Sequence, residues 1–130
     1  MRITQEADYA LRIILFLSGS DNIASAKIIC ENVNVPLRFT LKILNKLVAG
    51  NLARSFKGVK GGYKLKRPAA DISLLDVIEA IDGKIAINRC LEYGSCPNPD
   101  AQRLCRIRSE LSRINDILTT ELGASKLGTL

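Results

Sequence analysis

Histidine and tryptophan are absent from this chain, and only three phenylalanines and three tyrosines supply its aromatic rings. Without histidine, the chain lacks the commonest general base and a common metal ligand. It also lacks a Cys-x2-Cys pair, so neither a thioredoxin-like redox motif nor a zinc knuckle is indicated. No hydrophobic run is long enough to span a membrane, and residues 1–6 show no signal-peptide pattern. We therefore expect a cytoplasmic protein without membrane contact, and an enzyme is disfavoured.

What the chain does contain is a strong charge asymmetry. Its 130 residues carry a net charge of +6. Residues 1–67 hold 12 Lys and Arg against 4 Asp and Glu, a balance of +8, whereas residues 68–130 hold 7 against 9, a balance of −2. A basic first half indicates contact with nucleic acid. We predict a DNA-binding region at 1–70 and a second region at 71–130 that does not touch phosphate.

The first region has the pattern of a winged helix-turn-helix. Helical spacing and capping residues predict helices at 4–18, 25–32 and 36–49, with Thr4 and Ser25 as caps. Two short strands follow at 52–56 and 62–66. Two helices joined by a tight turn, with a hairpin after the second, are typical of this DNA-binding motif. The predicted fold class is therefore mainly α with a small β-wing, together with a long C-terminal dimerisation helix.

The third helix is the expected reading element. A stripe of Leu37, Leu41, Leu44 and Val48 is predicted to face the core. Basic residues lie on the opposite side of this helix. By themselves they could simply be a face exposed to solvent. Because this helix is the second of a helix-turn-helix, its basic residues favour insertion into the major groove, where Arg can bond guanine and Thr can touch a thymine methyl. The residues assigned to this role are Arg38, Phe39, Thr40 and Lys42.

The hairpin turn, residues 57–61, is rich in lysine and glycine. Lysines neutralise phosphates, and glycines allow positive φ and a close approach of the backbone to DNA. We expect this wing to lie along a neighbouring groove. Together with the cap Ser25, the DNA-binding set then includes Arg54, Ser55, Lys57, Lys60, Gly61, Gly62 and Tyr63.

In the second region, Ser73 is predicted to cap a short helix that ends at Asp82. A loop at 84–97 follows, and then a helix of some 22 residues that starts at Asn98. The tail, residues 123–130, is expected to fray. The long helix carries an apolar stripe that must be covered, either by packing across its own domain or by a second copy of the chain. Because paired half-sites need two reading helices, we favour the second copy and predict a homodimer. The stripe consists of Leu104, Ile107, Leu111, Ile114, Leu118 and Leu122.

Three cysteines, Cys90, Cys96 and Cys105, surround the start of this helix. Their spacing is irregular, which disfavours structural zinc. Three thiolates with an oxygen donor could hold an iron–sulfur cluster, although such clusters ordinarily take four thiolates. The alternative is that the three thiols are unrelated. Cys30, inside the second helix, is expected to be a buried apolar residue.

Several segments resemble the Rrf2 family of bacterial transcription regulators, and the resemblance covers nearly the whole chain. Its most specific parts are the wing and the segment 72–83. The matching residues are Asp8-Tyr9-Ala10-Leu11-Arg12, Pro36-Leu37-Arg38-Phe39, Lys42-Ile43-Leu44, Arg54-Ser55, Gly58 to Leu65, Arg67-Pro68, Ile72 to Ile78, Asp82-Gly83 and Cys90-Leu91.

The resemblance implies a homodimer that binds promoter DNA, mostly as a repressor. It implies a [2Fe–2S] or [4Fe–4S] cluster on Cys90, Cys96 and Cys105, which can be lost on purification. It further implies that Asp8, in the first helix, is a candidate fourth ligand reaching across the dimer. We therefore expect a repressor that senses redox state, nitric oxide or iron–sulfur status. The alternatives are a cluster-free repressor controlled by thiol oxidation or a protein partner, and a zinc-stabilised structural module.

Overall fold

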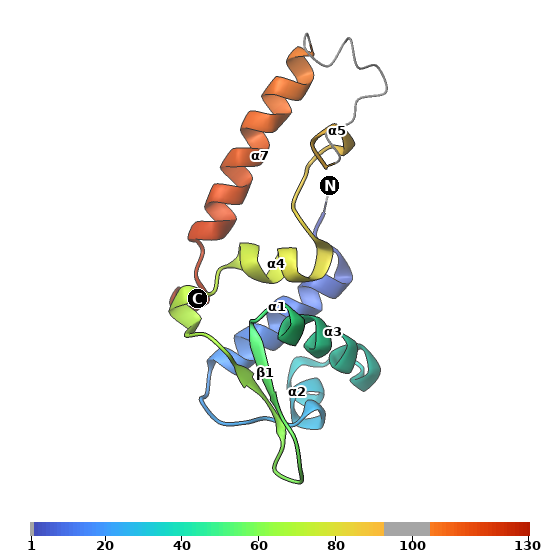
Figure 1. Cartoon of the computed structure of the whole chain (residues 1–130), viewed down its shortest axis with the longest axis vertical. Helices are drawn as coiled ribbons and strands as arrows, with labels where there is room; N and C mark the ends of the chain where they lie inside the picture. Colours follow the sequence, from blue (N-terminus) through green and yellow to red (C-terminus); the bar gives the residue numbers. More distant parts are fainter. Residues whose placement is uncertain (1, 93–104) are drawn as a thin grey trace.

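The computed structural model describes residues 2–92 and 105–130. It is mainly helical with one two-stranded antiparallel sheet, as the sequence predicts (Figure 1). The elements, in chain order, are α1 (Gln5–Ser18), α2 (Ala26–Val33), α3 (Leu37–Ala49), β1 (Ala53–Phe56), β2 (Gly62–Leu65), the 3₁₀ helix η1 (Ala69–Asp71), α4 (Leu74–Asp82), α5 (Arg89–Glu92), α7 (Arg106–Ala124) and the 3₁₀ helix η2 (Leu127–Thr129).

Side-chain caps fix where the helices begin. The Thr4 hydroxyl accepts a hydrogen bond from the Ala7 amide at 3.1 Å, and the Ser25 hydroxyl accepts one from the Ile28 amide at 3.2 Å. Ser73 forms a reciprocal capping box with the third residue of α4, as its sequence predicts. Each cap satisfies an amide that has no partner within its own helix.

A single core extends through both halves of the chain. α1 lies at its centre and packs against α2, α3 and α4. Ile72, Val77 and Leu127 from the second half are buried with the side chains of the first. Leu127 is only 3% exposed, and Leu127 N–H donates to the Ile72 carbonyl at 2.9 Å. The predicted frayed tail is therefore wrong, because the carboxyl-terminal residues pack against η1 and α4.

The wing is a two-stranded sheet extended by one more backbone pairing. β1 and β2 pair with Ala53 opposite Leu65 and Phe56 opposite Gly62. On the other edge of β2, Tyr63 exchanges two backbone hydrogen bonds with Ala24, of 2.8 and 3.0 Å. These bonds tie the wing to the segment before α2, so β2 is paired along both of its edges.

The long helix begins later than the sequence predicts. Cys105 has extended backbone angles (φ −77°, ψ 100°) and caps α7, so a continuous helix from Asn98 through Cys105 is wrong. Residues 98–104 lie outside the described part of the chain. α5 also occupies part of the predicted loop. α7 extends away from the core, far from the tip of the wing (Figure 1), and none of its residues is fully buried.

Across residues 2–92 and 105–130, none of the helices combines the length and the apolar character that crossing a membrane requires.

Candidate nucleic-acid interface

The turn between α2 and α3 fixes the orientation of α3. Asn34 ends α2 in the left-handed region (φ 55°), and its amide bonds the Cys30 carbonyl. Val35 follows and is only 3% exposed, which anchors the turn in the core. α3 then begins after Pro36 and packs against both α1 and α2. The result is a helix-turn-helix with one face of its second helix left open to solvent.

The exposed face of α3 is basic at its centre. Arg38, Lys42 and Asn45 are exposed and lie one helical turn apart. The Arg38 guanidinium lies over the Phe39 ring, 4.9 Å from its centre. This cation–π contact restrains the guanidinium without using its hydrogen-bond donors. The donors of Arg38 therefore remain free, and its contact with a guanine edge stays a prediction.

The predicted core stripe of α3 is partly wrong. The buried residues are Thr40, Ile43, Leu44 and Leu47, whereas Leu37 and Leu41 are 46% and 40% exposed. Thr40 is completely buried, and its hydroxyl donates to the Val35 carbonyl at 3.3 Å. The prediction that Thr40 touches a thymine methyl is therefore wrong, since that side chain faces the core.

An acidic residue that the sequence analysis missed lies beside this basic face. The Glu6 carboxylate, in the first turn of α1, pairs with Lys46 at 2.9 Å and with Lys42 at 3.6 Å, through the same oxygen. The hydrogen bond from Lys46 lowers the pKa of Glu6 below its ordinary value of 4.5, more than burial raises it, and the charge of Lys42 adds to the lowering. These pairs therefore contribute stability above the unfolded-state pKa, and the contribution is lost as pH falls through the lower folded-state pKa. No local sequence pattern joins residues 6 and 46, so only the fold could reveal this contact.

The wing presents its cations to solvent. Arg54 and Ser55 are exposed on β1, and Lys57 and Lys60 are exposed in the turn, beside the fully exposed Val59. Figure 1 shows this turn at the end of the molecule, beyond α2 and α3. Such a protruding basic turn can reach phosphates beside a groove that α3 occupies.

The glycines of the wing serve the packing of the hairpin itself. A Cβ on Gly61 would lie 2.3 Å from the Phe56 carbonyl oxygen, and one on Gly62 would lie 2.3 Å from that of Ala24. Gly62 also has φ 154°. Tyr63 is half-buried and packs against the core, while its backbone pairs with Ala24. For Gly61, Gly62 and Tyr63, the structure thus gives a structural role, and their contact with DNA stays a prediction.

Ser25 also has a structural role, because its hydroxyl oxygen caps α2. The hydroxyl proton is not used by that bond, so Ser25 can still donate to a phosphate oxygen.

Two of the three predicted cluster cysteines are described. Cys90 lies half-buried in α5, and Cys105 lies at the amino terminus of α7. Cys96 lies outside the described residues. The Cys105 sulfur accepts a hydrogen bond from the Arg108 amide at 3.4 Å, in the first turn of α7. The Nε of Arg108 is buried and has no acceptor among the described residues. A buried guanidinium nitrogen without an acceptor, three residues after Cys105, is compatible with an anionic group near the start of α7.

Within one protomer, the structure does not assemble a complete metal site. In the part of the chain that is described, no three Cys, Asp or Glu side chains come close enough to hold a metal ion. Asp8 pairs with Arg12 at 2.8 Å, so it is not brought together with Cys90 and Cys105. A role for Asp8 as a ligand would require the cysteines of a second copy and stays a prediction.

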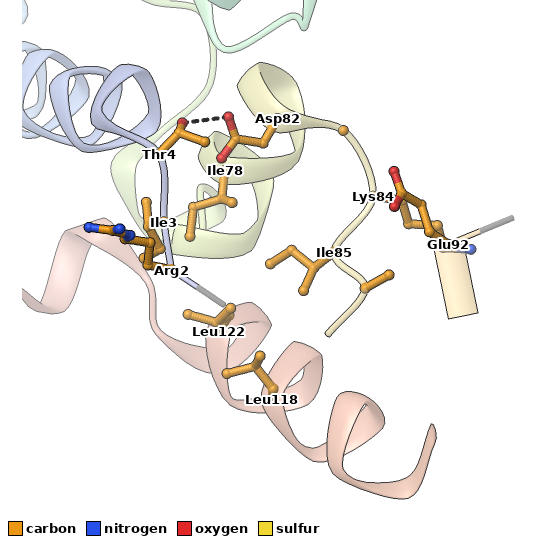
Figure 2. Close-up of a pocket in the computed structure, with 12 residues that line it drawn as sticks. Arg2, Ile3, Thr4, Ile78, Asp82, Lys84, Ile85, Glu92, Leu118 and Leu122 are labelled. Atoms are coloured by element: carbon orange, nitrogen blue, oxygen red, sulfur yellow. Dashed lines mark hydrogen bonds between the residues drawn. The ribbon is translucent and has the colours of Figure 1, made fainter. Parts of the chain in front are cut away.

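A pocket of about 440 Å³ lies at the junction between the DNA-binding region and α7 (Figure 2). Its walls are mostly apolar, from Ile3, Ile78, Leu118 and Leu122. At its edge, the Thr4 hydroxyl donates to the Asp82 carboxylate at 2.6 Å, which joins the start of α1 to the end of α4.

A second connection at this junction was also missed from the sequence. The Asn115 side chain of α7 accepts a hydrogen bond from the Ile87 amide at 3.0 Å and donates one to the Ile85 carbonyl at 3.3 Å. Both partners belong to the segment that leads to Cys90. These two hydrogen bonds join the segment before α5 to α7.

Comparison with known proteins gives one family. The family model Rrf2, described as an iron-dependent transcriptional regulator, matches residues 3–130. An HTH-type transcriptional regulator of Mycobacterium tuberculosis (strain H37Rv) is 34% identical over 99 residues, which cover 75% of this chain and 62% of that protein. The chain thus spans less than two thirds of the length of this relative.

Two further similarities extend over more of the chain. The HTH-type transcriptional regulator IscR of Escherichia coli (strain HS) is 27% identical over 132 residues, covering all of this chain and 80% of that protein. The structure of CymR, the global cysteine regulator of Bacillus subtilis, superposes with a TM-score of 0.79 at 22% identity, covering 98% of this chain and 94% of that one. This last similarity shows the fold.

Proposed function

Because the chain belongs to the Rrf2 family of transcriptional regulators, we propose that two copies bind double-stranded promoter DNA together and act as a repressor. The protein is a regulator and not an enzyme. The observation that carries DNA binding is the outward basic face of α3 beside the exposed wing turn. α3 enters the major groove, with Arg38 on a guanine edge, while Lys57 and Lys60 contact phosphates. We place this activity in the cytoplasm, where thiols stay reduced.

The exposed side of α7 supports the assignment of a homodimer. Ile107, Ile114 and Ile117 are 71%, 40% and 50% exposed on this helix. Apolar side chains repeating along one side of a helix gain free energy when a second helix covers them. A second copy of the same helix would do so, and it would give the two α3 helices that paired half-sites require.

We further propose that Cys90, Cys96 and Cys105 hold an iron–sulfur cluster, with Asp8 of the partner subunit as the candidate fourth ligand. The helix amino terminus at Cys105, the neighbouring Arg108 and the iron-dependent description of the family support this assignment. A bound cluster would supply a centre sensitive to oxidation, nitric oxide and iron supply. Loss of ligation at Cys90 would move the segment 85–92, which Asn115 holds against α7.

The test of the cluster is elemental analysis of protein purified without oxygen. We expect iron and acid-labile sulfide in equal amounts, a visible absorption spectrum, and loss of both elements in the Cys90→Ala variant. Cys30→Ala is the matched control, because Cys30 lies in α2 and outside the proposed ligand set. Absence of iron and sulfide from the wild-type protein under these conditions would exclude the cluster.

The second candidate is a cluster-free repressor in which the cysteines act as a thiol switch or a protein partner carries the signal. Its support is that Cys90 and Cys105 are both free cysteines and are half-buried rather than enclosed. In that case, hydrogen peroxide should change DNA affinity in iron-free protein, and Cys90→Ala should abolish the change. Zinc at one ion per chain without DNA affinity would instead match the structural module, which the family membership disfavours.

A further inference from the structure

The Glu6 carboxylate occupies an unusual place for an acidic group in a DNA-binding protein. It lies against the α3 face that is expected to meet DNA, where Lys42 and Lys46 both point to its Oε1 atom. The side chain of Glu6 is 29% exposed, against 61% for Lys42 and 37% for Lys46. Two of the cations on this face are thus partly neutralised from within the same chain.

Such partly exposed ion pairs open readily. Their attraction is weakened by water and offset by the entropy of holding long side chains in one geometry. A DNA phosphate that approaches α3 therefore competes with one carboxylate for two ammonium groups. Binding of DNA then gains less from these lysines than it would from two free ones.

We propose that Glu6 is an intramolecular competitor of DNA phosphate, which pairs with Lys42 and Lys46 and so weakens binding to DNA of any sequence. This inference rests on the proposed binding of DNA by α3. It assigns Glu6 a positioning role, because the carboxylate acts through the two lysines and does not itself contact DNA.

The consequence concerns specificity. Among the described residues no acid pairs with Arg38, which lies against Phe39 instead. Contacts with phosphate raise affinity for all sequences, whereas base contacts by arginine discriminate between them. A carboxylate that weakens only the lysine contacts leaves the base contact intact. The ratio of specific to non-specific affinity is thereby increased. This ratio decides how much of the protein binds its operator and how much binds the many non-specific sites of the genome.

The experiment measures binding of wild-type protein and Glu6→Gln to a mixed-sequence DNA duplex over a range of KCl concentrations. For Glu6→Gln we expect binding roughly three- to tenfold tighter at low salt. The slope of log affinity against log salt should be about one to two units steeper, because each additional phosphate neutralised contributes roughly 0.9. Asp116→Asn is the control: it makes the same change in net charge on an exposed residue of α7.

A double-mutant cycle with Lys42→Ala and Lys46→Ala together completes the test. In that background Glu6→Gln should have no effect on DNA affinity, since its targets are gone. Thermal unfolding of each variant checks the fold independently of DNA. Equal slopes for wild type and Glu6→Gln, or a Glu6→Gln effect that persists without the lysines, would overturn the inference while leaving the proposed function intact. Absence of any DNA binding by folded wild-type protein would overturn both.

Discussion

At the scale of the residue, Thr40 has a side chain that could contact a thymine methyl, but in the fold it points into the core. It lies between Phe39 and Leu41, which are both about two-fifths exposed, yet it is completely buried. Its hydroxyl satisfies the Val35 carbonyl in the turn that anchors α3. A polar group buried in this manner stabilises the turn only while its hydrogen bond is made.

We therefore expect Thr40→Val to change stability and not DNA recognition. The substitution keeps the shape but removes the donor to Val35, so the free energy of unfolding should fall by about 1 kcal/mol. Urea unfolding monitored by circular dichroism measures this change. Arg38→Ala is the complementary control, with weaker DNA binding and nearly unchanged unfolding. If Thr40→Val altered base preference at normal stability, Thr40 would have to reach DNA after all.

At the scale of the element, the wing contains residues that are free to bind DNA and residues that the hairpin needs in order to fold, and the sequence alone does not tell them apart. Lys57 and Lys60 are exposed, whereas Gly61 and Gly62 are confined by the Phe56 and Ala24 carbonyls. The lysines are therefore free to bind phosphate, and the glycines permit the hairpin to close and to pair with the segment before α2. Removing a lysine should leave the hairpin intact.

Lys60→Ala tests the wing on this basis. We expect weaker binding to all DNA sequences and a salt slope smaller by about one unit, because one phosphate contact is lost. Titrations of a mixed-sequence duplex at several salt concentrations supply both values. Lys84→Ala, at an exposed position just after α4, is the matched control and should behave as wild type. An unchanged slope for Lys60→Ala would show that the wing does not bind phosphate.

The elements of this fold differ in how well the sequence predicts them, and the cause is physical. Caps at Thr4, Ser25 and Ser73 are confirmed because they bond amides only three residues away. Which face of α3 is buried is not decided by the residues of α3 alone, because it depends on how the helix packs against α1 and α2. Leucine's apolarity favoured Leu37 and Leu41, but the fold buries Thr40 and Leu47.

The candidate site follows the same division. The sequence predicted the basic cluster of α3 and the wing correctly as exposed cations, because lysine and arginine seldom become buried. It could not predict Glu6 beside Lys46, or Asn115 beside Ile87, because these contacts join segments 40 and 28 residues apart. Both missed residues connect elements, and a pattern within one element carries no signal for them.

At the scale of the whole molecule, α7 keeps an apolar side exposed in a single chain. α7 touches the rest of the protein through α4 and α5, and its outer side keeps three isoleucines in solvent. The segment leading to Cys90 is bonded to the same helix by Asn115. We propose that two copies pair through α7 and that a change at Cys90 would then alter the spacing of the two α3 helices. The same helix would then carry both the dimer contact and the response to a change at Cys90.

Ile114→Glu tests whether α7 pairs the two copies. Ile114 lies midway along the outer side of α7, so a carboxylate there would have to lose its water on dimerisation, which is strongly unfavourable. We expect a monomer by sedimentation, with helix content retained because α7 makes no fully buried contact in one chain. DNA affinity should fall by orders of magnitude, since one α3 helix then binds without the other. Ser109→Glu, on another side of α7, should remain a dimer, and a dimeric Ile114→Glu protein would show that the copies pair through a different surface.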